Sequence, residues 1–181
     1  MFVWGDLMQF HIQETMSKGL KLTVDEKLDV SDLFKGRQDV YRTGPLHVSL
    51  QVTGHEGFIE VNGNLAIDLQ LVCSRCLEPT QDHAVIPFSE LFKPAVAADA
   101  ANDEYSEEES DDFIEVNADR LDLRPYVEEA LQLFIPLTPL CSEDCKGLCQ
   151  KCGQNLNKQK CSCDTAKIDV RFAALKDLFK E

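Results

Sequence analysis

The chain has 181 residues, of which 44% are hydrophobic and 28% are charged, so it can bury a core and does not have the composition of a disordered protein. Its formal net charge of −14 argues against a protein that binds nucleic-acid phosphates over its whole surface. The charge is concentrated in one region. Residues 99–122 hold eleven acidic side chains against Arg120 alone, a net of −10, which leaves about −4 for the rest of the chain.

The sequence gives no indication of export or membrane insertion. Residues 1–10 are apolar, but they contain Asp6 and lack both a basic start and a small-residue cleavage site. No run approaches the ~20 apolar residues that a membrane-spanning helix needs. We therefore expect a cytoplasmic protein, in a compartment where cysteines are more often metal ligands than disulfides.

The first regular pattern along the chain is a strand. Residues 20–40 mix apolar and charged side chains and show no single period. From residue 46 the sequence LHVSLQV alternates as a half-buried strand does. Its apolar members are Leu46, Val48, Leu50 and Val52. Gly54 and Gly57 then bracket a predicted turn.

Asn62-Gly63 is the strongest short hairpin signal in the chain and predicts a turn after the segment FIEV at 58–61. The predicted return strand, NLAIDLQLV, alternates and leads directly to Cys73. Its apolar members are Leu65, Ile67, Leu69 and Leu71. Residues 81–92 have an extended pattern again, ending at Pro94, so an antiparallel meander is expected around the first cysteine pair.

Residues 94–112 combine small and acidic side chains with almost no large apolar ones, which predicts a flexible acidic loop inside the domain. The sequence FIEV at 113–116 predicts one more strand.

The clearest helix is predicted for residues 122–135. We place Asp122 at the N-cap and Pro125 in the first turn, where its missing N–H costs little, and Pro136 ends the helix. Apolar residues at helical spacing form one face, which we expect to pack into the core. They are Leu123, Tyr126, Val127, Ala130, Leu131 and Phe134.

The eight cysteines form four short pairs, a spacing typical of metal ligands. The pairs are Cys73–Cys76, Cys141–Cys145, Cys149–Cys152 and Cys161–Cys163. Two tetrahedral sites of four thiolates would use all eight, so we expect two structural Zn²⁺ ions. Gly147 and Gly153 supply the backbone freedom that such turns need. Four thiolates leave no open position for water, so a catalytic zinc is not expected.

Spacing also suggests which pairs share an ion. The last two pairs lie within fifteen residues and predict a compact local site, here called site 2, of Cys149, Cys152, Cys161 and Cys163. The other pairs would form site 1, of Cys73, Cys76, Cys141 and Cys145, and would join the end of the meander to the segment after the helix. A grouping of Cys73 and Cys76 with Cys149 and Cys152 stays open.

A second short helix is predicted after site 2, with Asp169 as its N-cap. Its inward face would consist of Phe172, Leu175, Leu178 and Phe179. The expected fold class is α+β. Residues 1–140 would form a β-rich body with the acidic loop and the principal helix. Residues 141–181 would form a cysteine-rich zinc knuckle and the terminal helix, packed on the body as one domain.

The longest motifs of the chain resemble one family. LQLVCSRCLEP, PLCSEDCKGLCQKCGQNLN and the later CSC are similar to the bacterial and plastid YceD family, as are LDVSDLFKGRQDV and GPLHVSLQV upstream. Family members often have Asp-Pro-Arg where this chain has Asp169-Val170-Arg171, a small departure because proline is helpful but not essential there. Some relatives keep the first CxxC while lacking most later cysteines, which favours the grouping into sites 1 and 2.

The resemblance implies a role in the accumulation of large-subunit (23S) ribosomal RNA, without an established catalytic activity. We expect a non-enzymatic zinc-binding factor whose partner is precursor ribosomal RNA or a ribosomal protein, not a membrane or a small molecule. Candidate contacts are Lys146, Lys151, Lys158 and Lys160, although these lysines could simply offset thiolate charge.

Two other functions compete with this one. A redox-sensing zinc chaperone is the alternative, because oxidation of thiolates releases the metal. An enzyme is the weaker hypothesis: His11, His47, His55 and His83 are scattered, and the chain has no Walker loop, GxGxxG or HExxH motif.

Overall fold

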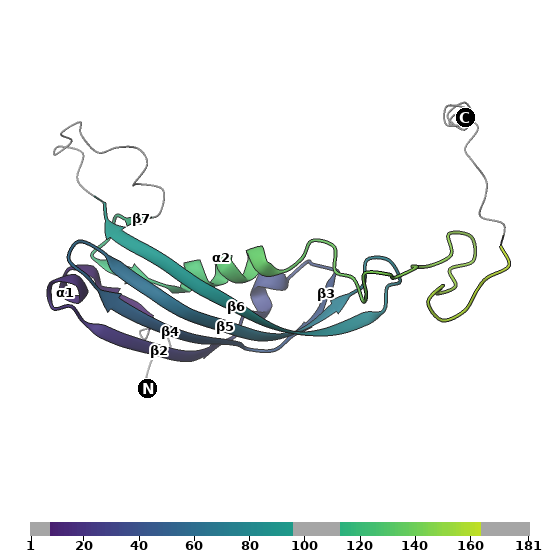
Figure 1. Ribbon diagram of the computed structural model, residues 1–181, viewed down its shortest axis with the longest axis horizontal. Coiled ribbons are helices and arrows are strands. Elements are labelled where there is room, and N and C mark those ends of the chain that lie inside the picture. Colours follow the sequence, from purple (N-terminus) through teal and green to yellow (C-terminus); the bar gives the residue numbers. More distant parts are fainter. Residues whose placement is uncertain (1–7, 96–112, 164–181) are drawn as a thin grey trace, which may run out of the picture.

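A long, curved sheet forms the centre of the computed structural model, which describes residues 8–95 and 113–163 (Figure 1). The strand order within these residues is β2-β4-β5-β6-β7, and β3 pairs with β5 as well. All pairings are antiparallel except that of β7 with β6. The strands are β2 (Lys21–Leu28), β3 (Val40–Thr43), β4 (Leu46–Gly54), β5 (Ile59–Val72), β6 (Pro79–Pro94) and β7 (Phe113–Val116).

The longest feature is the hairpin of β5 and β6, which stay paired from Ile59 opposite Phe92 to Val72 opposite Pro79. At a rise of about 3.3 Å per residue, the 14 residues of β5 extend over about 46 Å. The turn of this hairpin consists of residues 73–78 and holds the first cysteine pair. The hairpin therefore carries that pair to one end of the molecule.

The remaining elements lie on or beside the sheet. They are β1 (Gln9–His11), α1 (Ile12–Ser17), the 3-10 helix η1 (Ser31–Phe34), β8 (Arg120–Asp122) and α2 (Arg124–Phe134). Strands β1 and β8 form a separate two-stranded ladder. Figure 1 shows α1 at the end of the sheet opposite to the β5–β6 turn, with α2 lying along one face. No helix among the described residues is long and apolar enough to cross a membrane.

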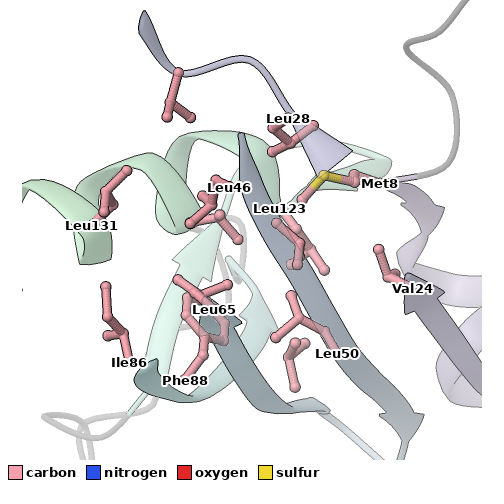
Figure 2. Close-up of a cluster of buried hydrophobic side chains, with 14 of the residues drawn as sticks. Met8, Val24, Leu28, Leu46, Leu50, Leu65, Ile86, Phe88, Leu123 and Leu131 are labelled. Atoms are coloured by element: carbon pink, nitrogen blue, oxygen red, sulfur yellow. The ribbon is translucent and has the colours of Figure 1, made fainter. Parts of the chain in front are cut away.

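The core lies between α2 and one face of the sheet. Every second residue is buried throughout β4 and along most of β5. These strands are therefore apolar toward α2 and polar on the other side. Figure 2 shows Leu131 of α2 beside Ile86, with Leu65 and Phe88 in the same cluster. Tyr126 of α2 packs edge-on against Phe92 of β6, with 4.9 Å between ring centroids.

The predictions of strands at 46–52, 81–92 and 113–116 are confirmed by β4, β6 and β7. The α+β class is confirmed in outline, with a sheet that dominates and one main helix. The segment 20–40, which showed no period, contains β2, η1 and the start of β3.

The predicted turn at Asn62-Gly63 is wrong. Strand β5 passes through both residues, and the turn lies earlier, where His55 N–H donates to the Phe58 carbonyl at 2.8 Å. Gly63 is needed for close approach: a Cβ there would lie 2.1 Å from the Ser49 carbonyl oxygen of β4. Asn62 donates to the Glu60 carboxylate at 2.8 Å and accepts from the Ser89 hydroxyl at 2.7 Å. The Asn-Gly pair thus serves strand packing instead of a turn.

The principal helix is confirmed, but it begins at Arg124 instead of 122. The Asp122 carboxylate accepts from the Arg124 N–H at 3.0 Å, while Leu123 is the N-cap and its side chain makes no capping bond. The inward placement of Phe134 is wrong, because its side chain is exposed and Ile135 is buried instead. Residues 96–112 of the acidic loop and the terminal helix from Asp169 lie outside the described residues.

Candidate metal centre

The structure brings the sulfurs of site 1 together. The Sγ atoms of Cys73, Cys76, Cys141 and Cys145 all lie within 4.8 Å of one another. Cys73 and Cys145 are 3.8 Å apart, and Cys76 and Cys141 are 3.6 Å apart. Four sulfurs placed tetrahedrally at 2.3 Å from Zn²⁺ would be about 3.8 Å from each other. The donor set therefore fits a zinc ion in both chemistry and size, whereas a disulfide would need about 2.05 Å.

Site 2 gathers its four sulfurs in the same way. The Sγ atoms of Cys149, Cys152, Cys161 and Cys163 also lie within 4.8 Å of one another. These are the same two groups of four that the spacing suggested, and the alternative of Cys73 and Cys76 with Cys149 and Cys152 does not occur. All eight cysteines are free thiols. Two groups of four cysteines could thus each hold a metal ion, and all-sulfur sites suit Zn²⁺ or another thiophilic metal.

The CxxC pair that comes first in each site lies on a six-residue turn, and the two turns have the same pattern of hydrogen bonds. In site 1, Cys73 N–H donates to the Glu78 carbonyl at 2.9 Å, and Leu77 N–H donates to the Cys73 carbonyl at 2.9 Å. In site 2, Cys149 and Gly153 make the corresponding bonds, each at 2.8 Å. The fifth residue has positive φ in both turns, 58° at Leu77 and 73° at Gly153. We call this repeated turn the knuckle.

Each knuckle lowers the pKa of its first cysteine. Burial raises the pKa of Cys73, but the backbone N–H groups of Cys76, Cys141 and Arg75 outweigh it and bring the pKa to about 6. The N–H groups of Cys152 and Lys151 lower the pKa of Cys149 to about 6. These N–H groups favour the thiolate, which is the form that binds metal.

One cysteine of each site shows the opposite shift, Cys141 in site 1 and Cys163 in site 2. Hydrogen bonding to Cys145 and Cys76 raises the pKa of Cys141 to about 12, and contact with Cys152 raises the pKa of Cys163 to about 12. In both cases a thiolate already present disfavours another negative charge. A divalent cation at the centre of each group would remove this repulsion.

Contacts other than sulfur fasten the segment after α2 to the hairpin turn. The Arg75 guanidinium donates to the carbonyls of Glu143 at 3.1 Å and Cys145 at 3.0 Å. Leu148 N–H donates to the Arg75 carbonyl at 3.1 Å, and Ser74 N–H donates to the Pro139 carbonyl at 2.8 Å. Arg75 thus positions Cys145 relative to the first knuckle.

Site 2 is tied to site 1 by side chains that the sequence reasoning missed. The Asn157 amide donates to Cys145 Sγ at 3.2 Å, and its oxygen accepts from the Lys146 N–H at 2.7 Å. Glu78 pairs with Lys158 at 2.6 Å and accepts from Asn155 at 3.4 Å. Asn155 and Asn157 lie in the motif CGQNLN, whose polar residues after the knuckle were the available signal.

The two sites differ in exposure. Three cysteines of site 1 are buried and only Cys141 is exposed. In site 2 only Cys149 is buried. Site 1 therefore lies inside the folded structure, whereas site 2 is open to solvent and to reagents.

The candidate lysines all lie on the surface near the sites. Lys146, Lys151, Lys158 and Lys160 are exposed, but the ammonium group of Lys158 is already paired with Glu78. Of the histidines, His83 bonds Asp68 at 2.7 Å and His55 bonds Glu60 at 3.0 Å, both away from the sulfurs. Neither pair includes a serine or cysteine nucleophile.

Comparison with known proteins finds one family whose model matches most of the chain. A family model described as "Large ribosomal RNA subunit accumulation protein YceD" matches residues 61–179. The chain is 32% identical over 133 residues to an uncharacterised protein of Mycobacterium tuberculosis (strain ATCC 25618 / H37Rv), covering 74% of this chain and 61% of that one. No solved structure matches it.

Two further relatives extend the comparison. The large ribosomal RNA subunit accumulation protein YCED homolog 1, chloroplastic, of Arabidopsis thaliana is 28% identical over 155 residues, which cover 74% of this chain and 48% of that protein. The uncharacterised protein YlbN of Bacillus subtilis (strain 168) is 27% identical over 158 residues and 87% of each chain. The chain thus spans about half to three fifths of the length of the plant and mycobacterial relatives.

Proposed function

Because the chain belongs to the YceD family, we propose that it is a non-enzymatic factor that supports the accumulation of large-subunit ribosomal RNA and holds two structural Zn²⁺ ions. The observation that carries this proposal is the extent of the family match, since residues 61–179 include all eight cysteines. Four sulfurs fill a tetrahedral zinc site, so the ions order the chain and do not activate water.

The proposed structural role of the ions follows from where the sites lie. Site 1 joins the β5–β6 turn to a segment 65 to 72 residues later in the chain. Together with Arg75 and Glu78, it would make residues 1–140 and 141–181 one domain. A structural zinc site contributes about 10 kcal/mol or more of apparent binding free energy in small zinc-folded peptides, enough to order this segment.

The partner we propose is precursor ribosomal RNA or a ribosomal protein, met in the cytoplasm. Lys146, Lys151 and Lys160 are exposed and each is next to a cysteine in the sequence, and Lys158 joins them if its pair with Glu78 opens. The acidic segment leaves the sheet at Pro94 and returns at Phe113, at the far end of β6 from the cysteines. The two ends of the acidic loop are thus anchored far from the lysines, and its acidic side chains could contact a basic ribosomal protein.

The test is the ratio of large- to small-subunit ribosomal RNA in cells that lack the protein. We expect the ratio to fall, to be restored by the wild-type chain and not to be restored by Cys73→Ser/Cys76→Ser. A Lys146→Ala/Lys151→Ala/Lys160→Ala variant tests the lysine surface, and Lys21→Ala/Lys27→Ala on the exposed face of β2 is the matched control. A normal ratio of large- to small-subunit RNA in cells without the protein would contradict the proposal.

The purified variants separate the two partner classes. If RNA is bound directly, the triple lysine variant should reduce the magnitude of the slope of log affinity against log salt by about 2 to 3, because each lost phosphate contact removes about 0.7 to 0.9. An unchanged slope alongside a reduced ratio in cells would assign the lysines to a protein partner.

A further inference from the structure

Exposed apolar side chains gather along the chain between the end of α2 and site 1, and we call this group the strip. The described residues expose seven large hydrophobic side chains, and four of them fall within eight positions: Leu133, Phe134, Leu137 and Leu140. Leu133 is 80% exposed and Leu137 is 90% exposed, while the intervening Ile135 is buried. Burying one such leucine contributes about 1.5 to 3 kcal/mol, so an uncovered strip of this size is costly.

We infer that residues 164–181 of the same chain cover this strip. They contain an apolar set at helical spacing, namely Phe172, Leu175, Leu178 and Phe179. Their charge also fits. Four acids and four bases give this segment a net charge of zero, so it can dock on an acidic chain without repulsion. A second copy of the chain would add another net charge of −14 to the assembly.

The metal sites place the segment within reach of the strip. Residue 164 follows Cys163 of site 2, and the strip ends at Leu140, next to Cys141 of site 1. Only three residues separate Cys145 of site 1 from Cys149 of site 2, a link that spans at most about 14 Å. The eight residues 164–171 can extend over about 27 Å, so Phe172 can return to Leu137 and Leu140.

Covalent connection makes this the favoured occupant. A segment tethered over a short distance meets the strip at millimolar effective concentration, which a separate partner rarely reaches. This inference rests on the one-domain arrangement proposed above and not on the ribosomal RNA role. The inference and the ribosomal RNA role can therefore fail independently of each other.

The experiment is amide hydrogen exchange of the full chain with both ions bound, followed by mass spectrometry of peptides from residues 164–181. We expect these amides to exchange at least tenfold more slowly than in a free peptide of that sequence. Leu133→Gln/Leu137→Gln should remove the protection without changing the number of bound ions, because both side chains are exposed and neither packs in the cluster around the site 1 cysteines. Tyr41→Gln, at an exposed aromatic residue on β3, is the matched control and should change nothing.

Three outcomes would overturn the inference. Exchange at the free-peptide rate in the wild type, or protection that survives Leu133→Gln/Leu137→Gln, would mean that residues 164–181 do not cover the strip. Protection that disappears on dilution, with light scattering showing a dimer becoming a monomer, would assign the strip to a second copy.

Discussion

Leu77 and Gly153 occupy the same place in two copies of one turn, and they show what the knuckle demands of a single residue. Both have positive φ, which costs a residue with a Cβ about 1 to 2 kcal/mol. Leu77 is 63% exposed, so its side chain recovers little of that cost through burial. Site 1 therefore carries a local strain that site 2 avoids.

We predict that Leu77→Gly will tighten zinc binding at site 1. Glycine removes the strain of the turn but loses more backbone entropy when the turn becomes ordered. The net gain in binding free energy should be up to about 1 kcal/mol, which is roughly a fivefold lower Kd. Gly153→Ala should weaken site 2 by a similar factor through strain alone, since nothing lies within 4 Å of the added Cβ. Competition with a chromophoric chelator measures both. Weaker binding by Leu77→Gly would contradict this account of the knuckle.

At this scale the sequence indicated which cysteines lie close together, but not the residues that support them. Four short pairs with turn glycines are a pattern, and proximity along the chain suggested which pairs lie together. Arg75, Glu78 and Asn157 act through contacts 70, 80 and 12 residues away, and one polar side chain carries no periodic signal of such a partner.

Among the elements, the strands that alternate strictly were predictable, whereas those whose pattern is interrupted were not. In β2, Glu26 occupies a position on the core side between Val24 and Leu28, which breaks the alternation on an outer strand of the sheet. Asn62-Gly63 misled for another reason. Glycine allows both a tight turn and the close approach of two strands, and only the tertiary structure decides between them.

The β5–β6 hairpin and the segment 139–163 are separate elements held together at site 1. We predict that Cys73→Ser/Cys76→Ser will free residues 139–163, with amide exchange there faster by at least tenfold, because the contacts of Arg75 and Glu78 are too few to hold the segment alone. Cys149→Ser/Cys152→Ser is the matched variant. It should lose one ion but leave the exchange of residues 73–78 unchanged.

Hydrogen exchange and native mass spectrometry of the two variants test this directly. If loss of site 2 also exposed residues 73–78, the two sites would form one cooperative unit, and the view of site 1 as an independent connection would be wrong.

At the scale of the molecule, the residues that the structure describes form two distinct apolar clusters. The large one fills the space between the sheet and α2, and the small one consists of Cys73, Cys76 and Cys145 with Leu148 beside them. The α+β class followed from the strand and helix patterns. The curvature of the sheet and the parallel pairing of β7 did not, because they depend on contacts between distant segments.

The lowered pKa values of two cysteines lead to a prediction about pH. Cys73 and Cys149 have a pKa of about 6 in the folded chain, below the ordinary thiol value of 9.0. Stabilisation by these thiolates is therefore complete above pH 9 and is lost as the pH falls through about 6. Bound metal competes with protons, so the ions should remain at pH 7 and leave at or below about pH 6.

The body should survive this loss, because its core contains no cysteine. We expect zinc release between about pH 6 and 4 to expose residues 139–163 while far-ultraviolet circular dichroism still reports the sheet. Zinc release is followed with a metal-sensitive dye after each acid step, and the return to pH 7 with added zinc should restore the starting state. Loss of the sheet signal together with the ions would mean that the metal sites hold the whole molecule, and half-release above pH 7 would contradict the low pKa of the two knuckle cysteines.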